Sequence, residues 1–189
     1  QSWFPDQRSF QGWQPIGSDL SSNFNGSYNG QGFTISNLHI DRSNSDDLGL
    51  FGYINGANIS NLNLSLADVS GHDNIGILVG QSGSGSYVDN CHVSGTISGN
   101  TNVGGMVGWH HDDFTMMINC TSAATVSGTD QVGGLCGYNQ AFINYSSASG
   151  LVIGNSYIGG FVGHCLGEIT DSYATGTVQG NNNVGAHTG

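Results

Sequence analysis

The sequence predicts an all-β fold, a parallel β-solenoid of about six to seven rungs of about 27 residues each, with an aromatic cap at its N-terminal end. Three observations support this prediction. A glycine-rich phrase recurs at a nearly constant spacing, other columns of similar residues keep step with it, and the 3.6-residue apolar period of helices is absent. No single rung could bury its own apolar face, so stability must come from neighbouring rungs.

The recurring phrase is an apolar residue and a glycine, followed by two or three further residues and a closing glycine. Val103-Gly-Gly-Met-Val-Gly108 and Ile158-Gly-Gly-Phe-Val-Gly163 are two clear copies. Short β-rich runs between the copies are separated by glycine and Asn/Ser turns. If each rung stacks about 4.8 Å from the next, equivalent residues form ladders along the axis. Copies start near residues 48, 75, 103, 132, 158 and 184.

A second column places an Asn or Asp two residues after an apolar residue. Stacked side-chain amides can hydrogen-bond along a solenoid axis and satisfy the backbone groups of turns. The column therefore predicts a structural ladder that faces inward or lies at a corner. Its predicted members are Asn37, Asn61, Asn90, Asn119, Asn144 and Asp171.

The N-terminal segment differs from the repeats. Residues 1–34 are predicted to be a capping or entry segment, and residues 35–189 the repeat region, because residues 35–40 match residues 59–64. Dense aromatic residues at one end of a solenoid most simply close its first rung; an aromatic platform for a ligand is the alternative. The aromatic residues of the segment are Trp3, Phe4, Phe10, Trp13, Phe24, Tyr28 and Phe33.

The repeats resemble a known family, the GLUG motif. The resemblance rests on Val132-Gly-Gly-Leu-Cys-Gly137 ahead of Ile143-Asn144, and on Ile169–Val178 ahead of Val184-Gly185. It covers the chain from about residue 13 onward and implies a large bacterial surface or secreted protein. Such proteins include adhesins of the filamentous haemagglutinin type and proteins in which the repeats accompany an immunoglobulin A peptidase domain. The zinc-peptidase signature His-Glu-x-x-His is absent, so no catalytic residue carries over.

Composition excludes several classes of function. Thirteen acidic residues against two basic ones give a net charge of -11, which argues against nucleic acid and anionic membrane surfaces as partners. No apolar run reaches the 18 or so residues that bilayer insertion requires. The polar residues are mostly Asn, Ser, Thr and Gly, which is typical of secreted bacterial proteins. We therefore expect an extracellular or cell-surface location.

The corner after the closing glycine varies most in length, and such insertions mark the face that is free to acquire a function. Its aromatic, imidazole and carboxylate side chains suit contact with a sugar, a protein or a metal, and a solvated polar loop is the alternative. Adjacent histidines point to opposite sides of an extended chain, so we expect no shared metal ion. No cofactor is predicted, although the acidic chain would accommodate a divalent cation such as calcium. The candidate ligand-binding residues are Trp109, His110, His111, Asp112, Asp113 and Phe114.

Two cysteines, Cys91 and Cys120, fall in one column one rung apart. The rung spacing lies within the Cα range of a disulfide, but straight stacking strains the dihedral angle. Buried free thiols are therefore the first prediction, and a disulfide is the alternative.

The residues favour a structural role over catalysis. Carbohydrate-cleaving β-helices need two carboxyl groups across a cleft, and lyases also need a basic group, yet the chain has only Arg8 and Arg42. We expect a non-enzymatic module of a larger protein, a passive rod that is structural or adhesive and that contacts host or surface glycans or proteins. One alternative is a fibre subunit that stacks end to end on itself or on neighbouring domains. The other is a carbohydrate-binding or carbohydrate-active β-helix.

Overall fold

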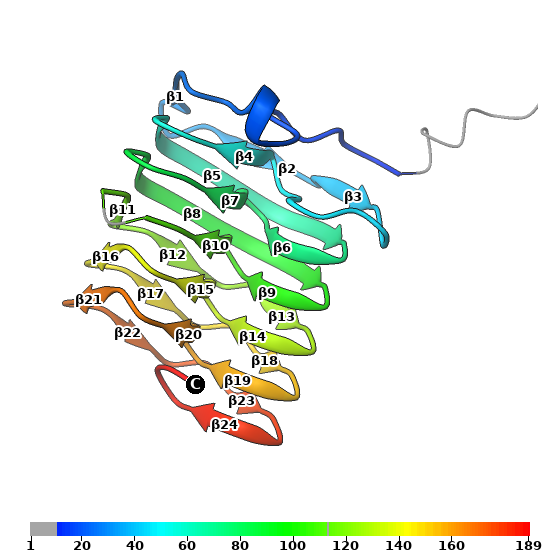
Figure 1. Cartoon of the computed structure of the whole chain (residues 1–189), viewed down its shortest axis with the longest axis vertical. Coiled ribbons are helices and arrows are strands. Elements are labelled where there is room, and N and C mark those ends of the chain that lie inside the picture. Colours follow the sequence, from blue (N-terminus) through cyan, green and yellow to red (C-terminus); the bar gives the residue numbers. More distant parts are fainter. Residues whose placement is uncertain (1–10, 113) are drawn as a thin grey trace, which may run out of the picture.

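The chain winds into stacked turns of short strands, as a computed structural model of residues 11–112 and 114–189 shows (Figure 1). Pairing between the named strands is parallel, and each rung pairs in register with the next, for example Val103 with Val132. The only helical element among these residues is the 3₁₀ turn η2 (Leu20–Ser22). The predicted all-β parallel solenoid is confirmed, with about six turns.

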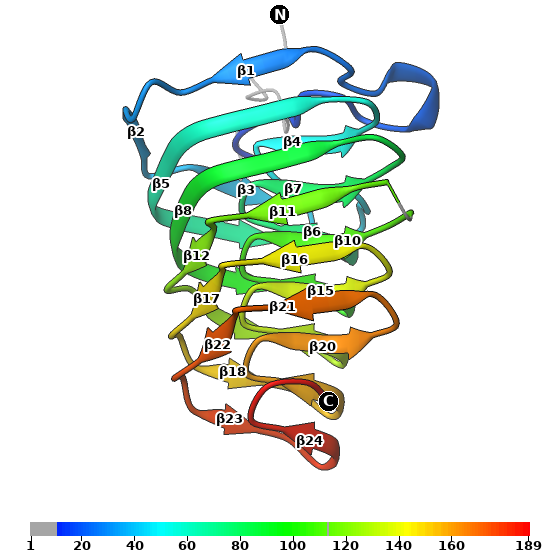
Figure 2. The ribbon, with the colours of Figure 1, turned by 90° about the vertical axis from the view of Figure 1, so that its left-hand side faces the viewer.

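Three sheets run along the axis, and Figure 2 shows the strands of each stacked one above another. The β10 sheet consists of β4 (Phe51–Ile54), β7 (Val79–Ser82), β10 (Val107–His110), β15 (Cys136–Asn139) and β20 (Val162–Cys165). The β9 sheet consists of β6 (Asp73–Gly76), β9 (Thr101–Gly104), β14 (Asp130–Gly133), β19 (Ser156–Gly159) and β24 (Asn182–Gly185). The long sheet consists of β1 (Ser27–Asn29), β2 (Thr34–Ser36), β3 (His39–Asp41), β5 (Asn58–Ser70), β8 (Tyr87–Ser98), β11 (Met116–Ile118), β12 (Thr121–Ser122), β13 (Thr125–Ser127), β16 (Phe142–Asn144), β17 (Ser147–Ala148), β18 (Val152–Ile153), β21 (Glu168–Thr170), β22 (Tyr173–Ala174) and β23 (Val178–Gln179).

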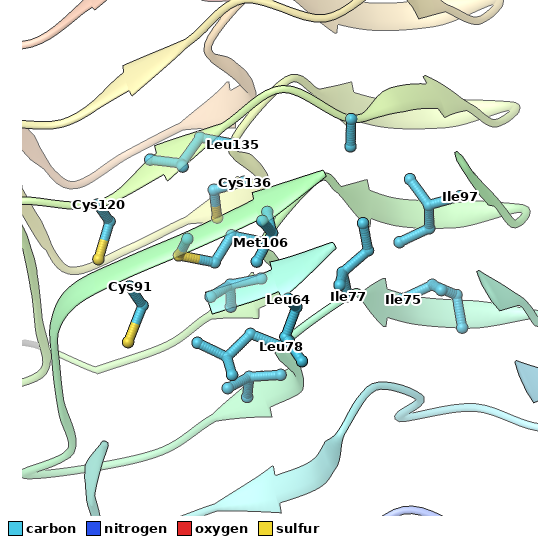
Figure 3. Close-up of a cluster of buried hydrophobic side chains, with 14 of the residues drawn as sticks. Leu64, Ile75, Ile77, Leu78, Cys91, Ile97, Met106, Cys120, Leu135 and Cys136 are labelled. Carbon is cyan, nitrogen blue, oxygen red and sulfur yellow. The ribbon is translucent and has the colours of Figure 1, made fainter. Parts of the chain in front are cut away.

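The apolar columns form one continuous core between the sheets. Val103 and Val107 of one rung are fully buried, and so are their equivalents on the neighbouring rungs. Met106, Leu78 and Leu135 fill the interior between the sheets (Figure 3). Full burial of such a side chain stabilises the fold by about 1.5–3 kcal/mol, so the repeated columns supply most of the driving force.

The glycines of the recurring phrase are required by close backbone contacts. A Cβ atom on Gly104 would lie 2.0 Å from the carbonyl oxygen of Val107, within the same phrase. A Cβ atom on the closing Gly108 would lie 2.4 Å from the backbone nitrogen of Ile75 on the preceding rung. No other residue fits at such distances, which explains why the phrase repeats with so little variation.

The predicted ladder of asparagines exists in part. Asn61, Asn90 and Asn119 lie on successive rungs with φ of 53°, 51° and 55°, and Asp171 adopts the same left-handed conformation. Asn tolerates this region of φ better than most residues. Asn90 and Asn119 are exposed and Asn61 is half-buried, so the ladder lies at an outer corner and does not face the core.

Two predicted members of this ladder were wrong. Asn144 pairs with Ile118, so Tyr145 occupies the corner position, with a φ of 48°. The buried apolar residue two positions before that corner is Ile143. The predicted pattern instead takes Phe142 as this residue, which shifts the corner by one position to Asn144. Asn37 follows Ser36, the partner of Ser65, and therefore lies at a different corner of the solenoid from Asn61.

The predicted start of the first rung was also wrong. Ile35 pairs with Leu64, whereas Tyr28 pairs with Ile59. Residues 16–41 thus already form a rung, with a parallel bridge from Ile16 to Phe51, so the boundary predicted at residue 34 falls inside it. Phe24 packs on Phe51 with ring centroids 5.0 Å apart, which covers the next rung. Of the predicted cap, Trp3, Phe4 and Phe10 lie outside the described residues, as does Arg8.

A second left-handed ladder lies at the corner before the β9 sheet. Asn102 donates its Nδ2 to Oδ1 of Asn74 at 2.7 Å, and Asn74 donates to Oδ1 of Asp47 at 2.9 Å. The corner is the last position of the three-residue interval before each Val or Ile column. Its residues with positive φ are Asp47, Asn74, Asn102, Gln131, Tyr157 and Asn183.

Candidate functional site

The predicted ligand-binding corner begins at the end of β10, where the adjacent side chains of Trp109 and His110 point to opposite sides of the strand. His110 is fully buried, and its Nδ1 lies 2.7 Å from Oγ of Ser82 on the preceding rung. Burial lowers the pKa of His110 to about 4, because the interior disfavours the charged imidazolium. His110 is therefore a neutral core residue at pH 7, and it is directed away from the surface on which Trp109 lies.

Trp109 belongs to a stack of rings on the outer surface of the β10 sheet. Its indole lies 5.9 Å from the ring of Tyr138, at an interplanar angle of 17°. The imidazole of His164 lies between Tyr138 and Tyr157, with centroids 5.0 Å from each. Both faces of the Tyr138 and His164 rings are thus covered by neighbours, and a sugar ring has no open face there on which to stack. The stack ties successive rungs together.

The remaining candidates of this corner do not converge on one point. His111 lies edge-on to Trp109, with centroids 5.1 Å apart. Asp112 occupies a turn with a φ of 84°, and Phe114 is 78% exposed. Asp113 lies outside the described residues. The structure brings together Trp109 and His111 only, so contact of this corner with a sugar or protein stays a prediction.

A group of potential metal ligands that the sequence analysis did not select lies at the corner before β6. One ligand atom each of Asp46, His72 and Asp73 lies within 4.8 Å of the others. Nδ1 of His72 is 2.9 Å from Oδ1 of Asp46 and 3.4 Å from Oδ2 of Asp73. The hydrogen bond to Asp46 and the charge of Asp73 raise the pKa of His72. This arrangement suits either ion pairs between a protonated His72 and the two carboxylates or the binding of a divalent cation. The three residues come together only through the register of successive rungs, so the sequence alone does not indicate the group.

The two aligned cysteines, Cys91 and Cys120, are buried free thiols in the structure. Cys91 and Cys120 occupy equivalent positions on β8 and the following rung, and both sulfur atoms lie in the interior (Figure 3). The thiol of Cys120 donates to the carbonyl oxygen of Ile118 at 3.1 Å. Burial raises the pKa of Cys120, which keeps its reactive thiolate form scarce.

A shallow groove crosses four rungs of the long sheet, along the paired residues Thr34, Asn63, His92 and Thr121. Two of its strands, β5 and β8, bend in the ribbon (Figure 2). Its volume is 290 Å³. Leu64 and Val93 form its floor, and His92 lines it, with Nδ1 2.7 Å from Oγ1 of Thr121. No Asp, Glu or Arg lines this elbow groove. Its polar lining residues are Thr34, Asn63, Ser65, His92, Ser94 and Thr121.

Among the residues that the structure describes, no helix is long and apolar enough to cross a membrane.

Comparison with known proteins shows what these repeats are similar to. The model of the GLUG motif matches residues 154–179, which confirms the predicted resemblance. Halomucin from Haloquadratum walsbyi is 41% identical over 100 residues, which are 51% of this chain and 1% of Halomucin. A crystallised protein from Bacteroides ovatus, proposed to be an immunoglobulin A1 protease, superposes with a TM-score of 0.74 over 91% of this chain and 63% of its own, at 21% identity. The chain therefore spans only part of both proteins, and the second likeness concerns the fold alone.

Proposed function

We propose that this chain is an extracellular structural and adhesive module, a passive rod within a larger protein. The parallel β-solenoid fold and the match to the GLUG motif support this proposal. The observation that carries the proposal is that side chains at the corners of the solenoid form hydrogen bonds with one another. They bond from rung to rung, as between Asn90 and Asn61 or Asn102 and Asn74. Side chains engaged in this way stiffen the rod along its axis.

A location outside the cell is supported by the surface and by the relatives. The chain has no lysine and only two arginines, and Asn, Ser and Thr supply most of its polar side chains. One structural neighbour is proposed to act on immunoglobulin A1, a protein found outside cells, and the sequence relative carries a mucin-like name. Protease treatment of intact source cells tests this part of the proposal. Cleavage of the module without lysis is the expected result, and full protection until lysis would contradict it.

Catalysis is not part of the proposal. His110, the most strongly perturbed histidine, is buried and neutral, and Cys120 is a buried thiol with a raised pKa. General acid–base and nucleophilic catalysis both need such groups at a surface that substrate can reach.

Solution scattering of the purified chain tests the rod. Six rungs at about 4.8 Å each give a body about 30 Å long, whose maximum dimension should not change with concentration. Growth of that dimension with concentration would instead favour end-to-end assembly into a fibre. A polysaccharide hydrolase and lyase panel on the same sample should show no turnover, and release of reducing or unsaturated sugar ends would contradict the passive role.

A further inference from the structure

The elbow groove of the long sheet runs along an outward-facing column of polar residues. Each member of this column pairs with the next, and its last two members continue it beyond the groove lining: Thr34, Asn63, His92, Thr121, Ser147 and Tyr173. The neighbouring column, which includes Leu64 and Val93, is buried and forms the floor. A ligand in the groove would therefore meet a row of hydrogen-bonding groups that recurs about every 4.8 Å over an apolar strip.

The polar groups of the groove retain capacity for further hydrogen bonds. Nδ1 of His92 is used by Thr121, and among the described residues the structure gives its Nε2 no protein partner. Nδ2 of Asn63 donates to the carbonyl oxygen of Gly32 at 3.0 Å, which leaves Oδ1 able to accept. Because a hydroxyl both donates and accepts, Thr34 and Ser94 add groups of either kind.

Charge selects the class of ligand. The chain carries thirteen acidic residues and a net charge of -11, yet the groove lining contains no acidic or arginine side chain. The field of the surrounding carboxylates repels anionic ligands, and the groove offers a cation no carboxylate to pair with. A neutral, hydroxyl-rich ligand fits both conditions.

Exposed aromatic rings lie at the two ends of the column. Phe33 is 72% exposed, and its carbonyl oxygen accepts from the backbone N–H of Asn63. Tyr173 is 61% exposed and lies on the rung beyond Ser147. Neither ring stacks on another aromatic ring in the described part of the chain, in contrast to Tyr138 and His164. Five rung steps, about 24 Å, separate the two ends.

We propose that the elbow groove binds a neutral linear oligosaccharide that lies along the solenoid axis, with its hydroxyl groups on the His92 column and a sugar ring stacked at one or both ends. The C–H faces of a pyranose are apolar and suit an aromatic ring, while its hydroxyls suit Asn, Thr and His. The inference rests on the adhesive role proposed above and assigns it a site and a ligand class.

Isothermal titration with hexasaccharides tests the site. The neutral probes are hexamers of β-1,4-glucose, α-1,4-glucose, β-1,4-mannose and N-acetylglucosamine, and the acidic probe is a hexamer of galacturonic acid. We expect at least one neutral hexamer to bind, and His92→Ala to weaken it about 3- to 10-fold, which is the effect of one or two lost hydrogen bonds. Tyr173→Ala should weaken the hexamer more than the matching trimer.

Matched controls separate loss of the site from loss of the fold. Thr125→Ala, in the same sheet but outside the groove, should bind as the unmodified chain does, and His92→Gln should retain part of the affinity. Each variant is compared by circular dichroism before titration. Absence of binding by every hexamer, equal affinity in His92→Ala, or preference for the galacturonic acid hexamer would overturn the inference. A chain that scatters as a rigid rod but binds none of these sugars would leave the structural role standing.

Discussion

Asn90 donates its side-chain Nδ2 to Oδ1 of Asn61, 2.8 Å away on the preceding rung, and both residues hold the left-handed backbone conformation. Each Asn of the pair therefore contributes to the solenoid in two ways: its backbone conformation turns the chain, and its side chain forms a hydrogen bond along the axis. Substitutions can separate these two contributions.

The first prediction concerns that separation. Asn90→Ala removes the amide and also places a residue with a Cβ but no local hydrogen bond at a φ of 51°, so we expect a loss of about 1–2 kcal/mol in unfolding free energy. Asn90→Gly removes the amide but accepts the conformation, and should cost less than Asn90→Ala. Urea denaturation of the two variants measures the difference. Equal losses would show that the conformation of the corner contributes nothing.

The second prediction concerns the closing glycine of the phrase. Gly108→Ala would place a Cβ 2.4 Å from the backbone nitrogen of Ile75, and neither backbone can move without disturbing both rungs. We expect a loss above about 3 kcal/mol or failure to fold, the outcome typical of overpacking against backbone. Gly56→Ala is the control, because its φ of +68° strains an alanine while no atom lies within 4 Å of the added Cβ. That control should cost about 1 kcal/mol; a similar loss in both variants would contradict the steric explanation.

Periodicity made the solenoid predictable, but it did not determine the exact register. The closing glycine recurs because backbone contacts such as that of Gly108 with Ile75 tolerate no side chain, so this signal survives in each copy of the phrase. The corner ladder is less strict, since Tyr145 adopts the left-handed conformation that Asn favours. The Asn pattern of the sequence therefore indicates Asn144, one residue before the true corner. The first rung was missed because its turn at Gln31–Gly32 has a different length from the later ones.

The candidate sites were less predictable than the fold for a related reason. The elbow groove and the Asp46–His72–Asp73 group join residues of adjacent rungs, and their proximity appears only once the pairing of rungs is known. Residues 109–114, by contrast, are contiguous and conspicuous in the sequence. The strand alternation of β10 nevertheless directs His110 inward and Trp109 outward, and this divides the group.

The third prediction concerns pH. The folded pKa of His110, about 4, lies below its ordinary value of 6.5, so the unfolded chain takes up the proton first as the pH falls. The contribution of His110 to stability is therefore complete above about pH 6.5 and is lost progressively toward pH 4, at up to about 1.4 kcal/mol per pH unit. Unfolding free energies of the unmodified chain and of His110→Gln, measured from pH 7.5 to 4.5, should converge as the pH falls. Parallel curves would mean that His110 is already protonated or accessible in the folded state.

The last prediction concerns the aromatic stack on the outer surface. His164 lies between Tyr138 and Tyr157, and its Nδ1 is buried with no partner among the described residues. Each ring contact is worth about 0.5–1.5 kcal/mol, so His164→Ala should lower the unfolding free energy by about 1–3 kcal/mol. His164→Phe keeps both contacts and removes the unsatisfied nitrogen, which carries its own cost when buried. We therefore expect His164→Phe to match or exceed the unmodified chain in urea denaturation. If His164→Phe instead destabilised the fold as much as His164→Ala, the imidazole nitrogen would be required and ring stacking would not explain this position.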